Sequence, residues 1–243
     1  MHVVAGCLEH GVGRLVFTSS PSVTFDGTDQ CGVDESTAYP TRWLCHYPRS
    51  KAMAEQHVLQ SNGKGGLLTC ALRPHLVWGP GDRHLVPGLI QRRRANRLWQ
   101  VGDGANLVDM VYIDNAAEAH VLAARALAPG AAAAGRAYYI SQGEPVNCWD
   151  WINQILALAG LPPTPRRISL KAAVRLGAVM ELVGRMIPGA GEPPLTRFLA
   201  AQLGRSHFYN IARARRDLGY EPRISTAEGM RRLAEDLASR HIV

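Results

Sequence analysis

Long apolar runs are missing from this 243-residue sequence, in which 47% of residues are hydrophobic and 19% are charged. No stretch of about 18 apolar residues is free of charge, so the sequence predicts no membrane-spanning helix. The first ten residues lack a basic region ahead of an apolar run, which is not the pattern of a secretory signal. The length is enough for one large domain, or for a domain with a small lobe.

Paired cysteines are also missing. The five cysteines are scattered between residues 7 and 148, and none forms a Cys-x-x-Cys pair. This pattern is typical of buried or partly buried thiols in a reducing compartment, so we expect a cytoplasmic protein. The nine histidines show no metal-ligand spacing, and neither His75 nor His84 has an acidic or Cys partner at such a spacing. We therefore expect no metal site.

Lysine is scarce. The 27 basic residues include only Lys51, Lys64 and Lys171, and the net charge is +7. The excess of arginine could favour an anionic ligand such as a dinucleotide phosphate or an acyl-carrier group. A drift of composition toward arginine would look the same. The run 92–94 has no interleaved aromatic residue, so we interpret it as the solvated face of a helix and expect no nucleic-acid partner.

The order of elements predicts an α/β fold. Buried strands are expected at 14–18, 67–73 and 137–140, with shorter extended segments at 98–101 and 108–113. Helices are expected at 2–10, 48–61, 85–96, 115–127, 148–159, 169–186 and 225–240. Residues 21–46 are expected to form a long loop, and Asp114 to cap the helix that follows it. The helix at 169–186 is apolar with scattered charges. We expect it to line an apolar pocket, in preference to lying on a membrane surface.

Tyr47 and Lys51 form the most informative pair in the sequence. A tyrosine four residues before a lysine on one helix places both side chains on the same face. A free phenol ionises only near pH 10, but a neighbouring ammonium favours the phenolate. Ser19 and Ser20 end a predicted strand, and ligands of open α/β sheets bind beyond the C-terminal ends of strands. A hydroxyl there could hold a carbonyl or alcohol oxygen, so these residues predict a device for proton transfer.

Four ordered motifs resemble those of the extended short-chain dehydrogenase/reductases. They are Thr18-Ser19-Ser20, Tyr47-Pro48-Arg49-Ser50-Lys51, Leu72-Arg73-Pro74 and Gly79-Pro80-Gly81-Asp82. The later runs 101–109, 112–117 and 212–222 also look like this family. Within it, the chain most resembles the 3β-hydroxysteroid dehydrogenase/isomerase group. That group includes sterol 4-carboxylate 3-dehydrogenases and bacterial reductases of long-chain β-keto acids.

The resemblance implies a doubly wound parallel sheet of the NAD(P)-binding Rossmann type, with a small, mostly helical C-terminal substrate lobe. Residues 1–145 would be the C-terminal part of the dinucleotide-binding core, with lobe insertions near 80–112. Residues 146–243 would be mainly the lobe and closing helices. The family's Gly-x-x-Gly-x-x-Gly turn, which cradles the cofactor pyrophosphate, is not in this sequence. We therefore expect the first strands of the sheet to be missing, and the chain to be an N-terminally truncated form.

The resemblance also assigns roles to residues. Tyr47 would be the catalytic acid/base, and Lys51 would favour its ionised form and bind the nicotinamide ribose. Ser20 would orient the substrate oxygen, with Ser19 the second choice. The cofactor, NAD or NADP, would contact a set of residues around them: Thr18, Ser19, Tyr47, Lys51, Pro74, His75 and Leu76. Asp82 would cap a turn or touch ligand, and Asp109 would be structural or line the site.

The implied reaction interconverts an alcohol and a ketone on an apolar substrate, namely a steroid, a sterol or a long-chain β-hydroxy or β-keto compound. Nucleotide-sugar epimerases and dehydratases carry an arginine in the position of Val108, which disfavours that branch. A non-catalytic remnant, or a module that binds a lipid or a partner protein, is the alternative. The family pattern also implies a homodimer, formed through the helix containing Tyr47 and the next long helix. Peripheral contact with a membrane is compatible with the sequence.

Overall fold

The computed structural model describes residues 2–187, 191 and 193–240, and its centre is a parallel sheet. The sheet has the strand order β1-β3-β8 and is built from β1 (Arg14–Thr18), β3 (Leu68–Pro74) and β8 (Arg136–Ile140). The three predicted core strands are thereby confirmed. Thr18 lies opposite Leu72, and Pro74 lies opposite Ile140. All three strands therefore end at the same edge of the sheet, which is where ligands bind in such folds.

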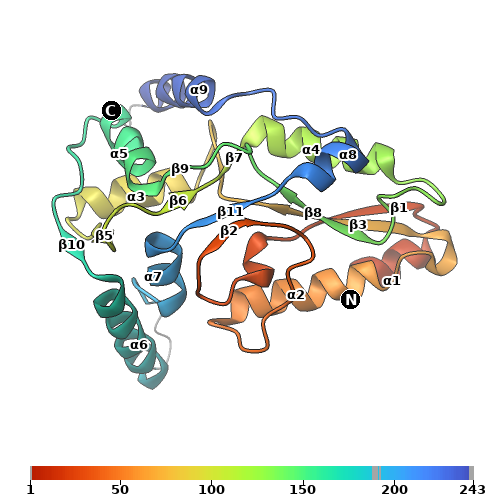
Figure 1. Ribbon diagram of the computed structural model, residues 1–243, viewed down its shortest axis with the longest axis horizontal. Helices are drawn as coiled ribbons and strands as arrows, with labels where there is room; N and C mark the ends of the chain where they lie inside the picture. The colour runs from red at the N-terminus through yellow and green to blue at the C-terminus, as the bar shows by residue number, and fades with distance from the viewer. Residues whose placement is uncertain (1, 188–190, 192, 241–243) are drawn as a thin grey trace.

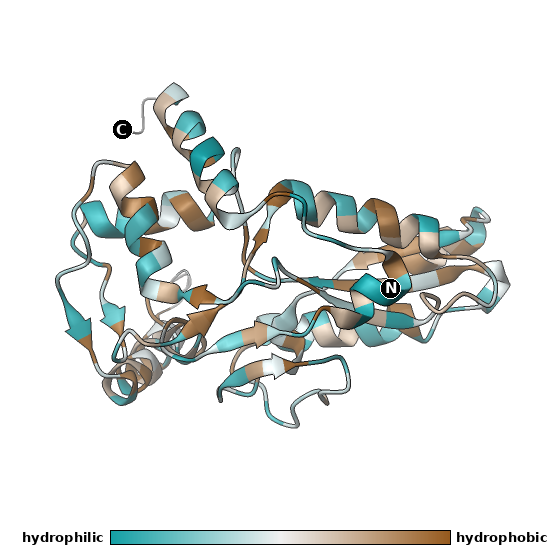
Figure 2. Ribbon diagram, turned by 45° about the horizontal axis from the view of Figure 1, so that its top comes forward, coloured by the Kyte–Doolittle hydropathy of each residue, from teal (hydrophilic) through white to brown (hydrophobic). Residues whose placement is uncertain are grey.

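Helices cover both faces of this sheet, which gives a three-layer α/β arrangement (Figure 1). One face carries α1 (His2–Glu9) and α2 (His46–Leu59), and the other carries α4 (Ile113–Ala126) and α8 (Ala212–Leu218). On α4 the buried alanines Ala116, Ala119 and Ala123 recur at helical spacing. Their small side chains let the helix pack closely on the strands, which are mostly apolar in Figure 2.

A second sheet gathers short strands from distant parts of the sequence. Its order is β2-β11-β6-β9, from β2 (Gln30–Val33), β11 (His207–Tyr209), β6 (Leu107–Val108) and β9 (Val146–Asn147). Two further pairs are β4 (Val77–Trp78) with β7 (Val111–Tyr112), and β5 (Gln100–Val101) with β10 (Arg167–Ile168). The expectation of one long loop at 21–46 is only partly right, since this segment holds η1 (Pro21–Thr24) and β2 between stretches of loop. The β2 sequence lacks apolar alternation, and its order comes from β11.

The remaining helices surround a second apolar cluster. They are α3 (Leu85–Arg94), α5 (Cys148–Leu158), α6 (Leu170–Met186), α7 (Arg197–Gly204) and α9 (Thr226–Ser239). Trp78 packs edge-on against both Trp151 and Tyr112, with ring centroids 5.5 Å apart in each pair. The cap predicted at Ser225 is present, since its Oγ accepts from Glu228 N, and Ser169 Oγ caps α6 in the same way by accepting from Ala172 N. The division at residue 145 stays a prediction.

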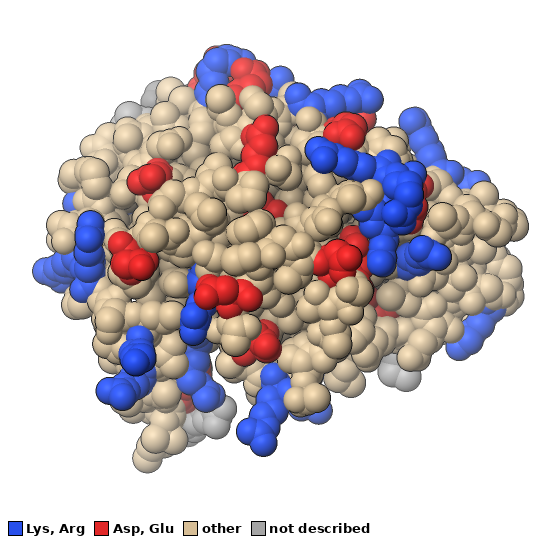
Figure 3. All heavy atoms as spheres, viewed as in Figure 1, with Lys and Arg blue, Asp and Glu red and all other residues tan. Residues whose placement is uncertain are grey.

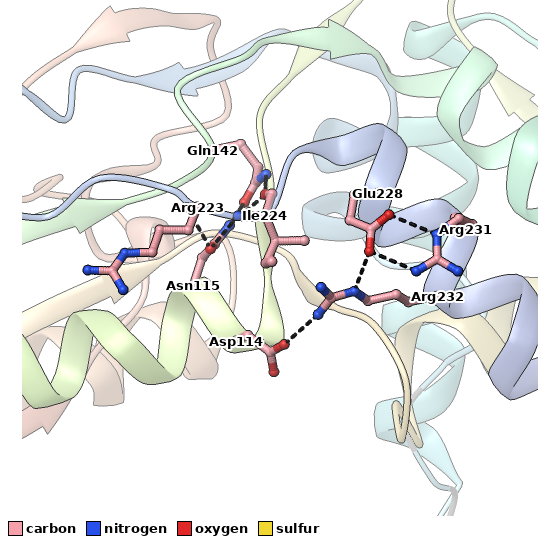
Figure 4. A network of polar contacts seen from close by, with 8 residues as sticks. All are labelled: Asp114, Asn115, Gln142, Arg223, Ile224, Glu228, Arg231 and Arg232. Carbon is pink, nitrogen blue, oxygen red and sulfur yellow. Dashed lines mark hydrogen bonds and ion pairs between the residues drawn. The ribbon is translucent and has the colours of Figure 1, made fainter.

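The expectation that Asp114 caps α4 is wrong. The cap position is Tyr112, without a side-chain acceptor, and the Asp114 carboxylate instead accepts from Arg232 of α9 at 3.2 Å (Figure 4). The neighbouring Asn115 is buried, and its Oδ1 accepts from the backbone N–H groups of Arg223 and Ile224. These contacts tie the start of α4 to the segment that leads into α9. None of the helices that the structure describes is long and apolar enough to cross a membrane.

Candidate active site

Tyr47 and Lys51 lie in the first two turns of α2, at the edge of the sheet where the core strands end. Pro48 fits the first turn because backbone N–H groups there need no intrahelical partner. Lys51 Nζ donates to the carbonyl oxygen of Thr18 at 2.9 Å, and Tyr47 is 51% exposed. The structure therefore places the lysine at the end of β1 and leaves the phenol on the same helix face open to solvent.

Ser19 and Ser20 follow β1 directly but have different environments. Ser20 Oγ, which is half-buried, caps η1 by accepting from the N–H and the hydroxyl of Ser22, at 3.3 and 2.9 Å. Its own O–H remains available to donate. Ser19 is 4% exposed, and its hydroxyl has no hydrogen-bond partner among the described residues. Because η1 packs against α2, both serines lie beside the helix that carries Tyr47.

The segment after β3 contains a backbone outlier. Pro74 is half-buried and ends the strand, and Leu76 two residues later has a φ of 43°. A left-handed conformation costs a residue with a Cβ about 1–2 kcal/mol, and such residues cluster at functional sites. Pro74 and Leu76 remain predicted cofactor contacts. The backbone strain at Leu76 supports that prediction, because such strain persists only where surrounding packing holds it and is common at functional sites.

His75, also predicted as a cofactor contact, turns its ring into the protein interior. Its Nδ1 lies 2.7 Å from Asp109 Oδ1, and its Nε2 lies 3.1 Å from His207 Nδ1. The other nitrogen of His207 lies 2.7 Å from the carbonyl oxygen of Gln202, and Asp109 Oδ2 accepts from Tyr209 N. Asp109 is fully buried and both of its carboxylate oxygens are bonded within the protein, which favours a structural role. Only the backbone of His75 remains a predicted cofactor contact.

The contacts among Asp109, His75 and His207 require one proton more than an ionised carboxylate and two neutral imidazoles carry. Gln202 O can only accept, so His207 Nε2 donates, and burial lowers the pKa of His207 to about 4, which keeps the ring neutral. His207 Nδ1 therefore accepts from His75 Nε2, and the extra proton lies between His75 Nδ1 and Asp109. Whether this proton is on His75 or on Asp109, the three side chains together carry no net charge, which lowers the free-energy cost of burying them.

A buried ion pair, Glu55 with Arg73, was not predicted as part of the site. Glu55 lies one turn beyond Lys51 on α2, and its carboxylate accepts two hydrogen bonds from the guanidinium of Arg73, at 2.6 and 3.1 Å. Tyr39 O–H donates to the same carboxylate, and burial together with this anion raises the pKa of the phenol. The only sequence signal was helical spacing, since residues 47, 51 and 55 share a face.

Asp82 and Thr18 both have side-chain hydrogen bonds in the structure. Asp82 accepts from the backbone N–H groups of His84, Leu85 and Val86, so it caps the start of α3. Thr18, predicted to contact the cofactor, has its hydroxyl 2.8 Å from Nε2 of His120 on α4. His120 escaped the sequence analysis because nothing local indicates that it reaches the end of β1. No group of three or more His, Cys, Asp or Glu in the described chain is arranged to hold a metal ion.

The residues at this edge fit the ribose and nicotinamide end of a dinucleotide. The Lys51 ammonium has three N–H donors. One of them bonds the carbonyl oxygen of Thr18, which leaves two for hydroxyl groups. The unpartnered hydroxyl of Ser19 is a further polar group beside them. The described residues contain no glycine-rich turn between a strand and a helix start, so the fit is to that end of the cofactor alone.

Sequence comparison identifies relatives along nearly the whole chain. The model of the 3-beta hydroxysteroid dehydrogenase/isomerase family matches residues 1–172. A 2-alkyl-3-oxoalkanoate reductase of Stenotrophomonas maltophilia is 52% identical over 98% of this chain and 72% of its own length. The reductase of the same name from Shewanella oneidensis is 46% identical over 97% and 63%. The mouse sterol-4-alpha-carboxylate 3-dehydrogenase is 32% identical over 96% and 66%. The chain thus spans roughly two thirds of these relatives.

Solved structures share the fold at low sequence identity. A UDP-glucuronic acid 4-epimerase from Bacillus cereus, in complex with NAD, has a TM-score of 0.69 at 18% identity, over 98% of this chain and 66% of its own. A dTDP-glucose 4,6-dehydratase mutant from Streptomyces venezuelae, with NAD bound, has a TM-score of 0.67 at 21% identity, over 98% and 64%. At these identities the likeness establishes the Rossmann-type fold alone.

Proposed function

The chain belongs to the 3-beta hydroxysteroid dehydrogenase/isomerase family, and from that membership we propose that it is an NAD(P)-dependent oxidoreductase. It would interconvert a secondary alcohol and a ketone on an apolar substrate. The observation that carries the proposal is the bond from Lys51 to the end of β1, four residues along the helix from an exposed Tyr47. The ammonium thus lies at the end of the strand that leads into the two serines, on the helix that also carries the phenol.

Tyr47 is the proposed acid/base. Its phenol would donate a proton to the ketone oxygen during reduction and take one from the alcohol during oxidation. The O–H of Ser20 is free to donate to the same oxygen, since its lone pairs already accept from Ser22. Lys51 would hold the ribose hydroxyls and favour the ionised phenol. The bound cofactor supplies or accepts the hydride, and the protein supplies orientation and proton transfer.

The substrate we propose first is a long-chain β-keto acid of the 2-alkyl-3-oxoalkanoate type, with a sterol or steroid second. The two bacterial relatives that are 52% and 46% identical carry that substrate in their names, and sterol-directed relatives are less similar. Val108 supports an apolar substrate, because it is fully buried between β11 and β9 and has no charge for a phosphate. A nucleotide sugar is therefore disfavoured.

The proposed partners follow from exposed apolar side chains and from the cysteines. Met53 on α2 is 60% exposed, which supports a homodimer formed through this helix. Leu182 and Met186 on α6 are 60% and 75% exposed, which supports peripheral contact with a membrane. None of the five cysteines forms a disulfide, in keeping with a cytoplasmic location.

The test is to compare the protein with its Tyr47→Phe variant, using a 2-alkyl-3-oxoalkanoate and NADPH or NADH, and to follow loss of the reduced cofactor. We expect turnover to fall by at least about 10²-fold, since proton transfer contributes this much. Cofactor binding, measured by fluorescence, should be unchanged. Turnover that survives in the variant would refute the role of Tyr47.

A control separates loss of chemistry from loss of fold. Tyr39→Phe removes a phenol that bonds Glu55 and lies outside the proposed chemistry, so it should retain most turnover. A wild-type chain that binds neither nicotinamide cofactor, yet still binds a lipid, would exclude catalysis by this chain. The alternative of a lipid-binding module would then replace the proposed function.

A further inference from the structure

A cavity lies among α6, α7 and the paired strands β5 and β10, and no residue of α2, which carries Tyr47, lines it. Its volume is about 430 Å³, which is within the usual range for pockets that bind small molecules. Its walls come from α6, α7, β5 and β10, through the apolar side chains of Leu176, Met180, Leu199, Leu203, Val101 and Ile168. The predicted role of the helix at 169–186 in lining an apolar pocket is thereby confirmed.

Two arginines at the mouth are brought together by a turn. Asn96 follows α3 with a φ of 54°, a conformation that asparagine adopts more readily than most residues. The reversed chain lets Arg97 N donate to the carbonyl oxygen of Arg92 at 2.8 Å. Both residues line the cavity and are exposed. Their guanidinium groups therefore lie where the cavity opens to solvent.

A third arginine reaches the mouth from another element. Arg166 precedes β10, and its carbonyl oxygen accepts from Gln100 N as β10 pairs with β5. Its guanidinium lies over the ring of Trp99, 5.5 Å from the centroid. This contact directs the charge toward the cavity wall, of which Trp99 is part. Positive groups from two separate segments thus meet at one opening.

These three arginines have no anionic partner among the described residues. None of them forms an ion pair there, and no acidic side chain lines the cavity. The neighbouring Arg93, by contrast, bonds the carbonyl oxygen of Pro162 and the side chain of Asn96. On the face that Figure 3 shows, some basic side chains lie beside acidic ones and others stand apart from them. The charged side chains that line this cavity, among the described residues, are therefore all basic.

We propose that this cavity is a binding site for one long-chain carboxylate, separate from the catalytic edge. The alkyl chain would occupy the apolar interior, where each buried methylene contributes about 0.8 kcal/mol. The carboxylate would meet the arginines, whose planar groups bind carboxylates in pairs of hydrogen bonds. No residue of α2, or of the segments that follow β1 and β3, lines it. Binding here therefore needs no turnover, and its test does not depend on the proposed reductase activity.

The experiment uses dodecanoate labelled with ¹³C at the carboxyl carbon, kept below its micelle concentration, and follows that resonance as protein is added. We expect saturable binding of one molecule per chain. The triple variant Arg92→Gln, Arg97→Gln, Arg166→Gln should weaken binding by about tenfold or more, since charge-assisted bonds are lost. Leu176→Trp, which fills the cavity wall at an exposed helix position, should weaken it as well.

Two controls make the result specific. Arg125→Gln removes an exposed cation from the end of α4 and should leave the affinity unchanged. Methyl dodecanoate has the same chain without the charge and should bind more weakly than dodecanoate. Circular dichroism checks that each variant is folded. Absence of saturable binding, or binding that neither the arginine nor the Leu176 change affects, would overturn the proposal. The proposal would also be overturned if the wild-type protein bound no dodecanoate but formed a dimer that dissociated only in the arginine variant.

Discussion

Glu55 and Arg73 form a two-pronged ion pair between α2 and β3, with Oε1–Nη2 and Oε2–Nε distances of 2.6 and 3.1 Å. Glu55 is fully buried and Arg73 is 3% exposed. Glu55 lies one turn from Lys51 and Arg73 lies one residue before Pro74, so the pair fixes the rotation of α2 against the end of β3. We interpret both residues as positioning groups for Tyr47 and Lys51.

Replacing Glu55 with glutamine should destabilise the protein by roughly 3–5 kcal/mol, because it leaves the Arg73 charge buried without its counter-ion. Urea unfolding followed by circular dichroism would measure this. Glu228→Gln is a matched control, since that carboxylate pairs with Arg231 and Arg232 on the surface of α9, and its loss should be much smaller. Equal losses in the two variants would contradict the role of the buried pair.

Acid should destabilise the protein through His207. Burial lowers its pKa from 6.5 to about 4, so the unfolded chain binds a proton between these values that the folded chain does not. This contribution to stability is complete above about pH 6.5 and is lost as the pH falls to about 4, for a total of roughly 3 kcal/mol. The groups that face the ring are His75 and Asp109.

The measurement is the unfolding free energy of wild type and His207→Gln at several pH values. The difference between the two should shrink as the pH falls through this window, because the variant lacks the titrating ring. His10→Gln, at an exposed position, should run parallel to the wild type. A difference between His207→Gln and the wild type that does not change with pH would contradict the assignment of a neutral, buried His207.

The two serines should behave differently in turnover. Ser20→Ala removes the hydroxyl that is free to donate to the substrate oxygen, so we expect a loss of about 10²-fold in kcat. Ser19→Ala removes a buried hydroxyl without a partner and should cost little. Ser22→Ala tests whether the turn alone matters, because it removes a donor to Ser20 and leaves the Ser20 hydroxyl in place. Steady-state kinetics on the three variants would decide, and a larger loss in Ser19→Ala would exchange the assigned roles.

Gly177→Ala should loosen the contact between α6 and α7. A Cβ at this position would lie 2.7 Å from the carbonyl carbon of Thr196 and 2.8 Å from Arg197 N, and backbone atoms cannot yield as a flexible side chain can. We expect a loss of about 1–3 kcal/mol from overpacking, despite the better helix propensity of alanine. Gly88→Ala in α3 meets nothing within 4 Å and should be neutral or stabilising. Thermal unfolding of both variants measures the contrast.

The sequence was sufficient to predict the parallel core, because local pattern determines it. β1, β3 and β8 are apolar runs bounded by glycine or proline, and each lies where it was expected. Ser225 caps the last helix as predicted, since a cap depends on residues three positions away. The pairing of Tyr47 with Lys51 on one helix face follows from spacing alone.

The rest depends on partners that local pattern does not reveal. β2 is ordered by β11, and Asp114 is drawn away from its helix end by Arg232. His75 was predicted as a cofactor contact because it follows β3, and no local pattern indicated that its ring would bond Asp109 and His207 in the interior. Each of these interactions joins residues that are far apart in the sequence.

The pairing of β2 with β11 sets an order for events on the ribosome. His207 pairs with Gln30, so β2 is synthesised long before its partner exists. At 5–20 residues per second, the intervening chain takes about 10–40 s to appear. During that interval β2 has no strand to pair with, and Cys31 within it, which is exposed even in the folded protein, is accessible to oxidants. Order in β2 therefore depends on completion of the chain as far as β11.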